Sequence, residues 1–256
     1  MGRLILFLTF FSCLSVHALV PENIFQNDID LIDKAITNHT ISKPYFLKLP
    51  PEDKFELIRK DPKNRILSDF EISEFFSTRV HFWFNIYTLY PSSSVVIHDS
   101  KDLNIVYNVI DFSELQNSII NRHTAYALQV RYTEERIKLY KKAFNNLARG
   151  KKKGEIEMRI LKALDKAGYK YPSRRKRKKF FNKLSSSIRT QTGQRDNIIQ
   201  GYKNYLTFKP FMDKYFNVFK LPTELLAIPF VESSFNTKAT SKVGATGIWQ
   251  FMPFIG

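Results

Sequence analysis

Hydrophobic residues in the second half of the chain recur with the spacing of amphipathic helices. Apolar residues return every three or four positions between residues 124 and 150, and again between 154 and 168. Gly150 and Gly168 close these two stretches, and glycine at that position commonly ends a helix. We therefore predict that residues 119–212 are largely helical.

Residues 80–112 have a different pattern. The stretches 80–90, 93–99 and 103–112 are rich in Val, Ile, Phe and Tyr, and short polar segments that favour turns separate them. We predict a small antiparallel sheet of about three strands. Trp83 and its aromatic neighbours could stack on a sugar, but filling the core of the sheet is their more frequent role. The expected fold class is mainly α with a small antiparallel β segment at about 80–112.

The start of the chain has the features of an export signal. Arg3 precedes an apolar stretch from Leu4 to Val16, and Val16-His17-Ala18 suits cleavage after Ala18. We predict that residues 1–18 are a signal peptide and that the mature protein lies in the periplasm or cell envelope, with membrane association as an option. An uncleaved anchor and lipidation at Cys13 are the alternatives, although the residues before Cys13 fit lipoprotein processing poorly.

The chain is strongly basic. It has 40 Lys and Arg residues against 24 Asp and Glu, a formal net charge of +16, which favours an anionic partner. Arg174–Lys179 is a run of six basic residues that by itself suggests a nucleic-acid patch. Because an exported protein does not normally meet nucleic acid, we expect no such partner. Anionic envelope polymers or lipids are the functional option for this run, and a solvated helix face is the simpler interpretation.

The sequence gives no sign of a metal site or a cofactor. His39, His81, His98 and His123 lack the helical spacing of a ligand set, and the single cysteine lies in the predicted signal. The sequence also has no phosphate-binding glycine loop and no Gly-x-Ser-x-Gly element. We expect neither a bound metal nor a cofactor.

A carboxylate ends an apolar run in the segment LLAIPFVESSFN, residues 225–236. Leu225, Ile228 and Val231 repeat at three-residue spacing, which predicts a helix with one buried face. Glu232 lies beside that face. Such a glutamate is most often a surface residue. It could instead be an acid in an apolar cleft, where the neutral, protonated form is favoured.

The residues after Glu232 carry side chains that can bind a carbohydrate. Ser241 and Gln250 offer polar groups for hydroxyls and amides, and Trp249 offers a flat face for a sugar ring. The sequence contains no Asp or Glu after Glu232.

The segment from residue 221 to residue 251 closely resembles the start of the catalytic domain of murein lytic transglycosylases of the soluble-lytic-transglycosylase type. It is most similar to the membrane-bound D type. The shared elements are Leu-Pro-x-Glu-Leu, Val-Glu-Ser-x-Phe-Asn and Ala-x-Ser-x-x-Gly-Ala-x-Gly-x-Trp-Gln-Phe. With the helical segment before it, the resemblance covers about residues 192–256, a quarter of the chain.

The resemblance implies a lysozyme-like, mainly helical domain that acts on peptidoglycan. The implied reaction is a lyase reaction, in which the β-1,4 bond between N-acetylmuramic acid and N-acetylglucosamine is cleaved and a 1,6-anhydro end is left. Glu232 matches the family glutamate that serves first as acid and then as base. The substrate's acetamido group takes the place of a second carboxylate, unlike in ordinary glycosidases. Ser241 and Gln250 match positions that line the sugar groove.

The expected organisation is a signal peptide at 1–18, a mixed α/β region at 19–118, a basic helical region at 119–212 and a truncated catalytic domain at 213–256. Family domains continue past the Trp-Gln-Phe element with a second groove wall and a tyrosine motif. We therefore expect near-background activity from the 256-residue chain. Two other classes stay open, a non-catalytic envelope protein that binds peptidoglycan and a nucleic-acid-binding protein.

Overall fold

A computed structural model describes residues 52–118 and 121–254. The chain divides after Ser42 into two units, and every described residue belongs to the second unit, Lys43–Gly256. The predicted signal peptide at 1–18, Cys13 and residues 19–51 lie outside the described residues. The predictions about them therefore stay predictions.

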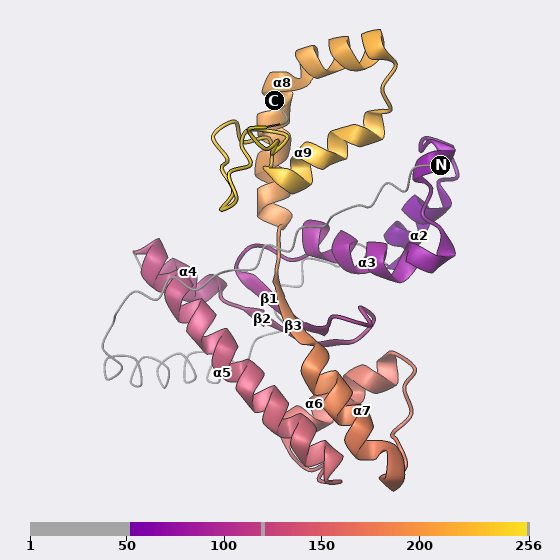
Figure 1. Ribbon diagram of the computed structural model, residues 1–256, viewed down its shortest axis with the longest axis vertical. Helices are drawn as coiled ribbons and strands as arrows, with labels where there is room; N and C mark the ends of the chain where they lie inside the picture. Colours follow the sequence, from indigo (N-terminus) through magenta and orange to yellow (C-terminus); the bar gives the residue numbers. More distant parts are fainter. Residues whose placement is uncertain (1–51, 119–120, 255–256) are drawn as a thin grey trace. The chain divides into compact units, whose positions relative to one another are not determined.

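Helices make up most of the described residues, and the strands among them form one small sheet (Figure 1). This confirms the expected fold class, mainly α with a small antiparallel β segment. The α-helices are α2 (Glu52–Lys60), α3 (Glu74–Thr88), α4 (Ser113–Ser118), α5 (Arg122–Ala148), α6 (Glu155–Lys166), α7 (Arg174–Ser187), α8 (Arg195–Phe219) and α9 (Ala227–Glu232). The strands are β1 (Ser94–Asp99), β2 (Val106–Asp111) and β3 (Ile188–Thr192), and two 3-10 helices are η2 (Ser68–Phe70) and η3 (Thr223–Leu226).

The sheet has the order β2-β1-β3, and both strand pairs are antiparallel. In the central strand, Val96 lies opposite Val109 of β2, and Ile97 lies opposite Thr190 of β3. All six residues of β1 are buried. This burial explains the continuous apolar run that the sequence shows there, because a strand covered on both faces does not alternate.

The membership of the sheet differs from the prediction. Residues 80–90 were expected to form a strand, but they belong to helix α3 and the turn after it. Phe82 and Ile86, one helical turn apart, are buried and pack with Val96 of the sheet. An aromatic-rich run of this length fits a buried helix face as well as a strand, so its pattern does not decide between them.

The third strand comes instead from a segment that was expected to be helical. Strand β3 has the polar sequence IRTQT and follows α7 without a break. Its pairing with β1 rests on backbone hydrogen bonds, which carry no sequence signal. The fold therefore joins residues near 95 to residues near 190.

The long helices end where their glycines predicted. Gly150 and Gly168 have φ angles of +86° and +81°, in the left-handed region that glycine adopts without strain. Within these two helices, Tyr140, Leu147 and Ile160 are fully buried where the helices pack against each other and against the sheet. No helix within residues 52–118 and 121–254 is long and apolar enough to cross a membrane.

The start of α8 is fixed to α3 and to the turn that follows α3. Backbone N–H groups of Gln194 and Arg195 donate to the carbonyls of Ile86 and Tyr90, each over 2.9 Å. A Cβ on Gly193 would overlap the Tyr90 and Pro91 carbonyls, so this close approach requires glycine. Helix α8 then runs without interruption past residue 212, where the predicted boundary between two regions lies.

Candidate functional site

Glu232 is the last residue of α9, a helix of only six residues. The repeat of residues 225, 228 and 231 predicted a single helix there, but the structure has the 3-10 helix η3 followed by α9. Pro229 is the third residue of α9, where a backbone N–H has no partner within the helix. The proline therefore causes no loss of a hydrogen bond at this position.

The apolar face expected around Glu232 is open in the described part of the chain. Glu232 is half-buried, whereas Ile228 and Val231 are 43% and 45% exposed. The short helix buries Pro229 against its neighbours and leaves the other two side chains outward. Among the described residues, no hydrogen bond or ion pair holds the Glu232 carboxylate. The expectation of a buried helix face is therefore wrong for these residues.

The chain turns sharply after Glu232 onto a cluster of aromatic rings. Ser234 and Phe235 have φ angles of +52° and +55°, which is unfavourable for residues other than glycine. The Phe235 side chain is 1% exposed. Its ring centroid lies 4.8 Å from that of Phe230 and 5.1 Å from that of Tyr205. Burial of this ring offsets the cost of the backbone conformation.

Helix α8 supports this turn from the side (Figure 1). The Asn204 side-chain amide donates to the Ser234 carbonyl over 2.9 Å. Gly201 is buried, and a Cβ there would lie 3.1 Å from the Cα of Ser234 and 3.2 Å from the Phe230 ring. Gly201 and Asn204 thus set the position of the residues on both sides of Glu232.

The segment that follows, residues 239–251, is a loop held by backbone contacts. Single bridges join Thr246 to Thr240 and to Phe251. Gly244 and Gly247 adopt φ angles of +89° and +74°. The Ser233 hydroxyl donates to the Ile248 carbonyl over 2.7 Å, which connects the loop to the end of α9.

The two residues predicted to bind substrate shape this loop. Ser241 Oγ accepts a hydrogen bond from the Ala245 N–H over 2.9 Å. Gln250 Nε2 donates to the carbonyls of Gly247 and Ala239, at 2.8 and 3.2 Å. Among the described residues no hydrogen bond joins either side chain to Glu232. Their role in binding substrate stays a prediction.

The site also borders helix α3, which the sequence did not indicate. Burial raises the pKa of the Tyr87 phenol, and the nearby negative charge of Glu232 raises it further. The Trp83 ring stacks on Tyr87 with centroids 5.9 Å apart. The Leu67 N–H donates to the Glu224 carboxylate over 2.9 Å and lowers the pKa of that acid. Sequence reasoning missed Tyr87 because its segment was interpreted as a strand.

Comparison with known protein families identifies the part of the chain around Glu232. Residues 218–255 match the family model of the transglycosylase SLT domain. We call these residues the SLT segment. The match confirms a domain of the lytic transglycosylase type here, and it contains Glu232, Ser241 and Gln250. Comparison with curated proteins and with solved structures gave no match.

The SLT segment depends on residues that the match does not include. It begins within the last turns of α8, whereas Gly201, Asn204 and Tyr205 lie more than ten residues earlier. The sequence resemblance had extended to this helix as a lead-in. The signal available in the sequence was Gly201, because a glycine inside a helical pattern often marks a place where another segment packs closely.

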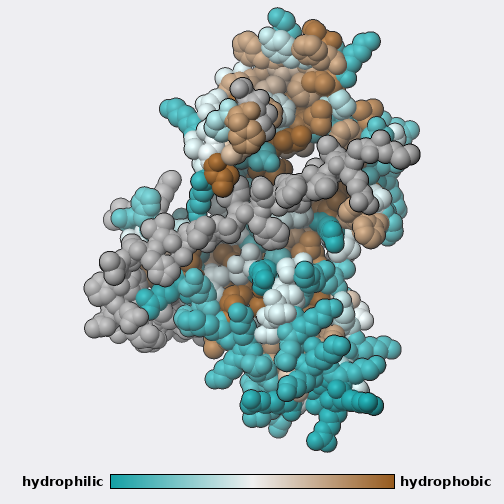
Figure 2. Space-filling view, viewed as in Figure 1, coloured by the Kyte–Doolittle hydropathy of each residue, from teal (hydrophilic) through white to brown (hydrophobic). Residues whose placement is uncertain are grey.

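Hydrophobic side chains are exposed around the SLT segment. Figure 2 shows them at the surface where α8 and α9 lie in Figure 1. They include Tyr202, Leu206, Phe211, Tyr215, Val218, Phe219, Ile228, Val231, Phe251 and Phe254. Exposed apolar groups in such number are typical of a surface that binds a partner or a ligand.

Proposed function

We propose that this protein is a peptidoglycan lytic transglycosylase in which Glu232 is the acid and base. The observation that carries the proposal is the SLT match at residues 218–255, a range that includes Glu232. The nearest type, by motif, is the membrane-bound D type.

The proposed reaction uses Glu232 in two successive proton transfers, first as a donor and then as an acceptor. Protonated Glu232 gives its proton to the glycosidic oxygen as the bond from C1 of N-acetylmuramic acid breaks. The acetamido oxygen of the same sugar stabilises the positive charge at C1. The Glu232 carboxylate then takes the proton of the C6 hydroxyl as that oxygen bonds to C1. The products are a free 4-hydroxyl and a 1,6-anhydro end, and Glu232 is protonated again.

Ser241 and Gln250 retain groups that could orient the sugar. The Ser241 oxygen accepts from the backbone, which leaves its O–H hydrogen as a donor. Both amide hydrogens of Gln250 are used by backbone carbonyls, which leaves Oε1 as an acceptor. The pair therefore offers one donor and one acceptor to hydroxyl or acetamido groups.

The setting proposed for this reaction is the cell envelope. The predicted signal peptide at 1–18 would export the chain to the periplasm, where peptidoglycan lies. Exposed aromatic and aliphatic side chains near Glu232 suit contact with the apolar faces of sugar rings.

The test is chromatography of the soluble products released from purified sacculi. In a chain that carries the complete catalytic domain of the family, the proposal expects 1,6-anhydro-muropeptides and a loss of about 10²–10⁴-fold with Glu232→Gln. Glu71→Gln is a matched control, because it makes the same change at an exposed glutamate outside the site. Anhydro products formed by Glu232→Gln at the wild-type rate would refute the assignment.

A second candidate function is binding of peptidoglycan without cleavage. The open apolar face beside Glu232 favours it, because a catalytic acid is usually enclosed. Co-sedimentation with sacculi separates the two. Retention on sacculi without any released anhydro product, in wild type and in Glu232→Gln alike, would support binding alone.

A further inference from the structure

The positive charge of the chain is concentrated in one stretch. Residues 141–183 contain seventeen Lys and Arg residues and three acidic residues, a formal balance of +14 out of the whole chain's +16. All other residues together are close to neutral. Repulsion among so many like charges opposes compact folding, and an anionic partner would relieve it. We therefore expect such a partner for this stretch.

These cations lie on three connected elements. They occupy the last turns of α5, the loop of residues 149–153 with the following helix α6, and α7. Figure 2 shows hydrophilic residues gathered where these elements lie in Figure 1. We call residues 141–183 the cationic module. Fifteen of its cations are exposed: Lys141, Lys142, Arg149, Lys151, Lys152, Lys153, Lys162, Lys166, Lys170, Arg174, Arg175, Lys176, Lys178, Lys179 and Lys183.

The charge of the module is not compensated internally. Among the described residues, Arg159 is the one cation of the module in an ion pair, with Glu155 at 2.9 Å. Glu157 is buried and accepts from Asn146. The exposed cations are therefore available to an external anion.

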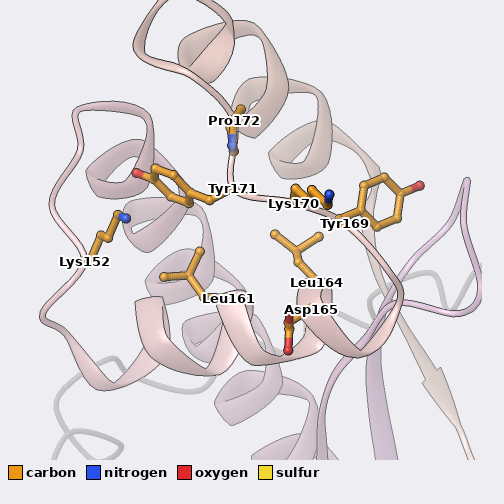
Figure 3. A pocket seen from close by; sticks show the side chains of 8 residues that line it. All are labelled: Lys152, Leu161, Leu164, Asp165, Tyr169, Lys170, Tyr171 and Pro172. Atoms are coloured by element: carbon orange, nitrogen blue, oxygen red, sulfur yellow. The ribbon is translucent and has the colours of Figure 1, made fainter.

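Two cations of the module crowd one aromatic ring. Lys152 Nζ lies 3.6 Å, and Arg177 Cζ 5.0 Å, from the centroid of Tyr171. The Nε of Arg177 is buried and has no partner in the described part of the chain. Lys152 and Tyr171 also line a cavity of about 220 Å³ together with Lys170 (Figure 3). Two lysines thus line a cavity whose lining contains one carboxylate, that of Asp165.

The module exposes few large apolar side chains, of which Met158 of α6 is the most open at 56%. Phe181 and Leu184 of α7 are 0% and 7% exposed, so they face the interior. Tyr169 donates its hydroxyl to Asp102, and Tyr171 is covered by Lys152 and Arg177. The module therefore presents little apolar surface for insertion into a bilayer, and the Tyr171 ring, which a base could otherwise stack on, is covered by cations. What it offers outward is charge spread over several elements.

We propose that the cationic module binds the surface of a membrane rich in anionic phospholipid, through electrostatic contact and without insertion. Charge that is spread over three elements suits a surface of many headgroups better than a single bound ion. Each Lys or Arg near an anionic bilayer strengthens binding by about fivefold. Salt weakens the contact, because the screening length falls from about 10 Å at 0.1 M to about 3 Å at 1 M. This role does not depend on the proposed reaction of Glu232.

The experiment is co-sedimentation of the full chain with vesicles of phosphatidylglycerol and phosphatidylcholine, and with vesicles of phosphatidylcholine alone. Neutral vesicles measure any attachment that does not depend on charge. We expect tighter binding to the anionic vesicles, lost as salt rises. The triple substitution Arg174→Gln, Arg175→Gln and Lys176→Gln should weaken it about 100-fold.

The control removes three charges elsewhere. It combines Lys63→Gln, Lys101→Gln and Lys203→Gln, three exposed lysines outside the module. This triple variant should retain binding within a few fold. Equal weakening by both triple variants would show that only net charge matters and would overturn the proposal. Three other results would also overturn it. They are equal binding to anionic and neutral vesicles, tighter binding to a 20-base-pair DNA duplex at the same salt, and full competition by free glycerophosphate at the phosphate concentration of the vesicles.

Discussion

Gly201 of α8 lies directly against Ser234, two residues beyond Glu232. A Cβ at residue 201 would come within 3.1 Å of the Ser234 Cα. The neighbouring Asn204 holds the Ser234 carbonyl. Helix α8, which precedes the SLT segment, thus sets the backbone next to the candidate acid.

Gly201→Ala should destabilise the protein by about 1 kcal/mol. The added methyl group meets backbone that the Asn204 bond and a left-handed φ prevent from moving. Overpacking of this kind costs about 1–3 kcal/mol, and the better helix propensity of alanine returns about 1 kcal/mol. Urea denaturation measures the difference. Thr207→Ala, exposed on the same helix, is the control, and a stabilised Gly201→Ala variant would contradict the packing described.

Phe235→Ala should cost about 3–5 kcal/mol, because it empties the centre of an aromatic cluster. The ring is 1% exposed and contacts Phe230 and Tyr205. Phe254→Ala is the matched control, since that ring is 80% exposed, and its effect should stay within about 0.5 kcal/mol. Thermal and urea unfolding of both variants check this, and equal effects would show that the cluster does not support the turn.

Gln250→Ala should loosen the loop that carries Ser241. It removes two hydrogen bonds to backbone carbonyls, each with a net contribution of about 1 kcal/mol. Amide hydrogen exchange in residues 239–251 should become about tenfold to a hundredfold faster, while α5 keeps its protection. Thr237→Ala, at an exposed position nearby, should not change these rates. Unchanged exchange in Gln250→Ala would mean that backbone contacts alone hold the loop.

Stability should fall between pH 10 and pH 12. The hydrogen bond from Tyr169 to Asp102 raises the pKa of this phenol from 10.0 to about 12. Burial raises the pKa of the Tyr107 phenol as well. A raised pKa means that the folded state holds the proton more tightly, so the contribution is complete below pH 10 and is lost as pH rises through the folded pKa.

Denaturation midpoints at pH 8, 10, 11 and 12 measure this loss. Tyr169→Phe should flatten part of the decline, because phenylalanine has no proton to lose. Asp102→Asn should flatten it too, since it removes the charge that opposes formation of a phenolate. An unchanged alkaline profile in both variants would rule out this contact as the cause.

Local signals in the sequence were sufficient to predict where the long helices end and to recognise the SLT motif. Gly150 and Gly168 ended α5 and α6 as predicted, because glycine accepts the left-handed backbone angle at low cost. The family resemblance at residues 221–251 was confirmed as a lytic-transglycosylase-type segment, because its motif residues are ordered and closely spaced. The roles of Glu232, Ser241 and Gln250 came from that resemblance and stay predictions.

The sequence by itself determined the mainly helical character, the position of the cationic module and the presence of the SLT segment. All three depend on residues that are neighbours along the chain. Only the tertiary structure decided that residues 80–88 are helical, that β3 completes the sheet, and that Ile228 and Val231 point outward. These features depend on what each segment packs against, and contacts between distant segments leave no local pattern from which they could be read.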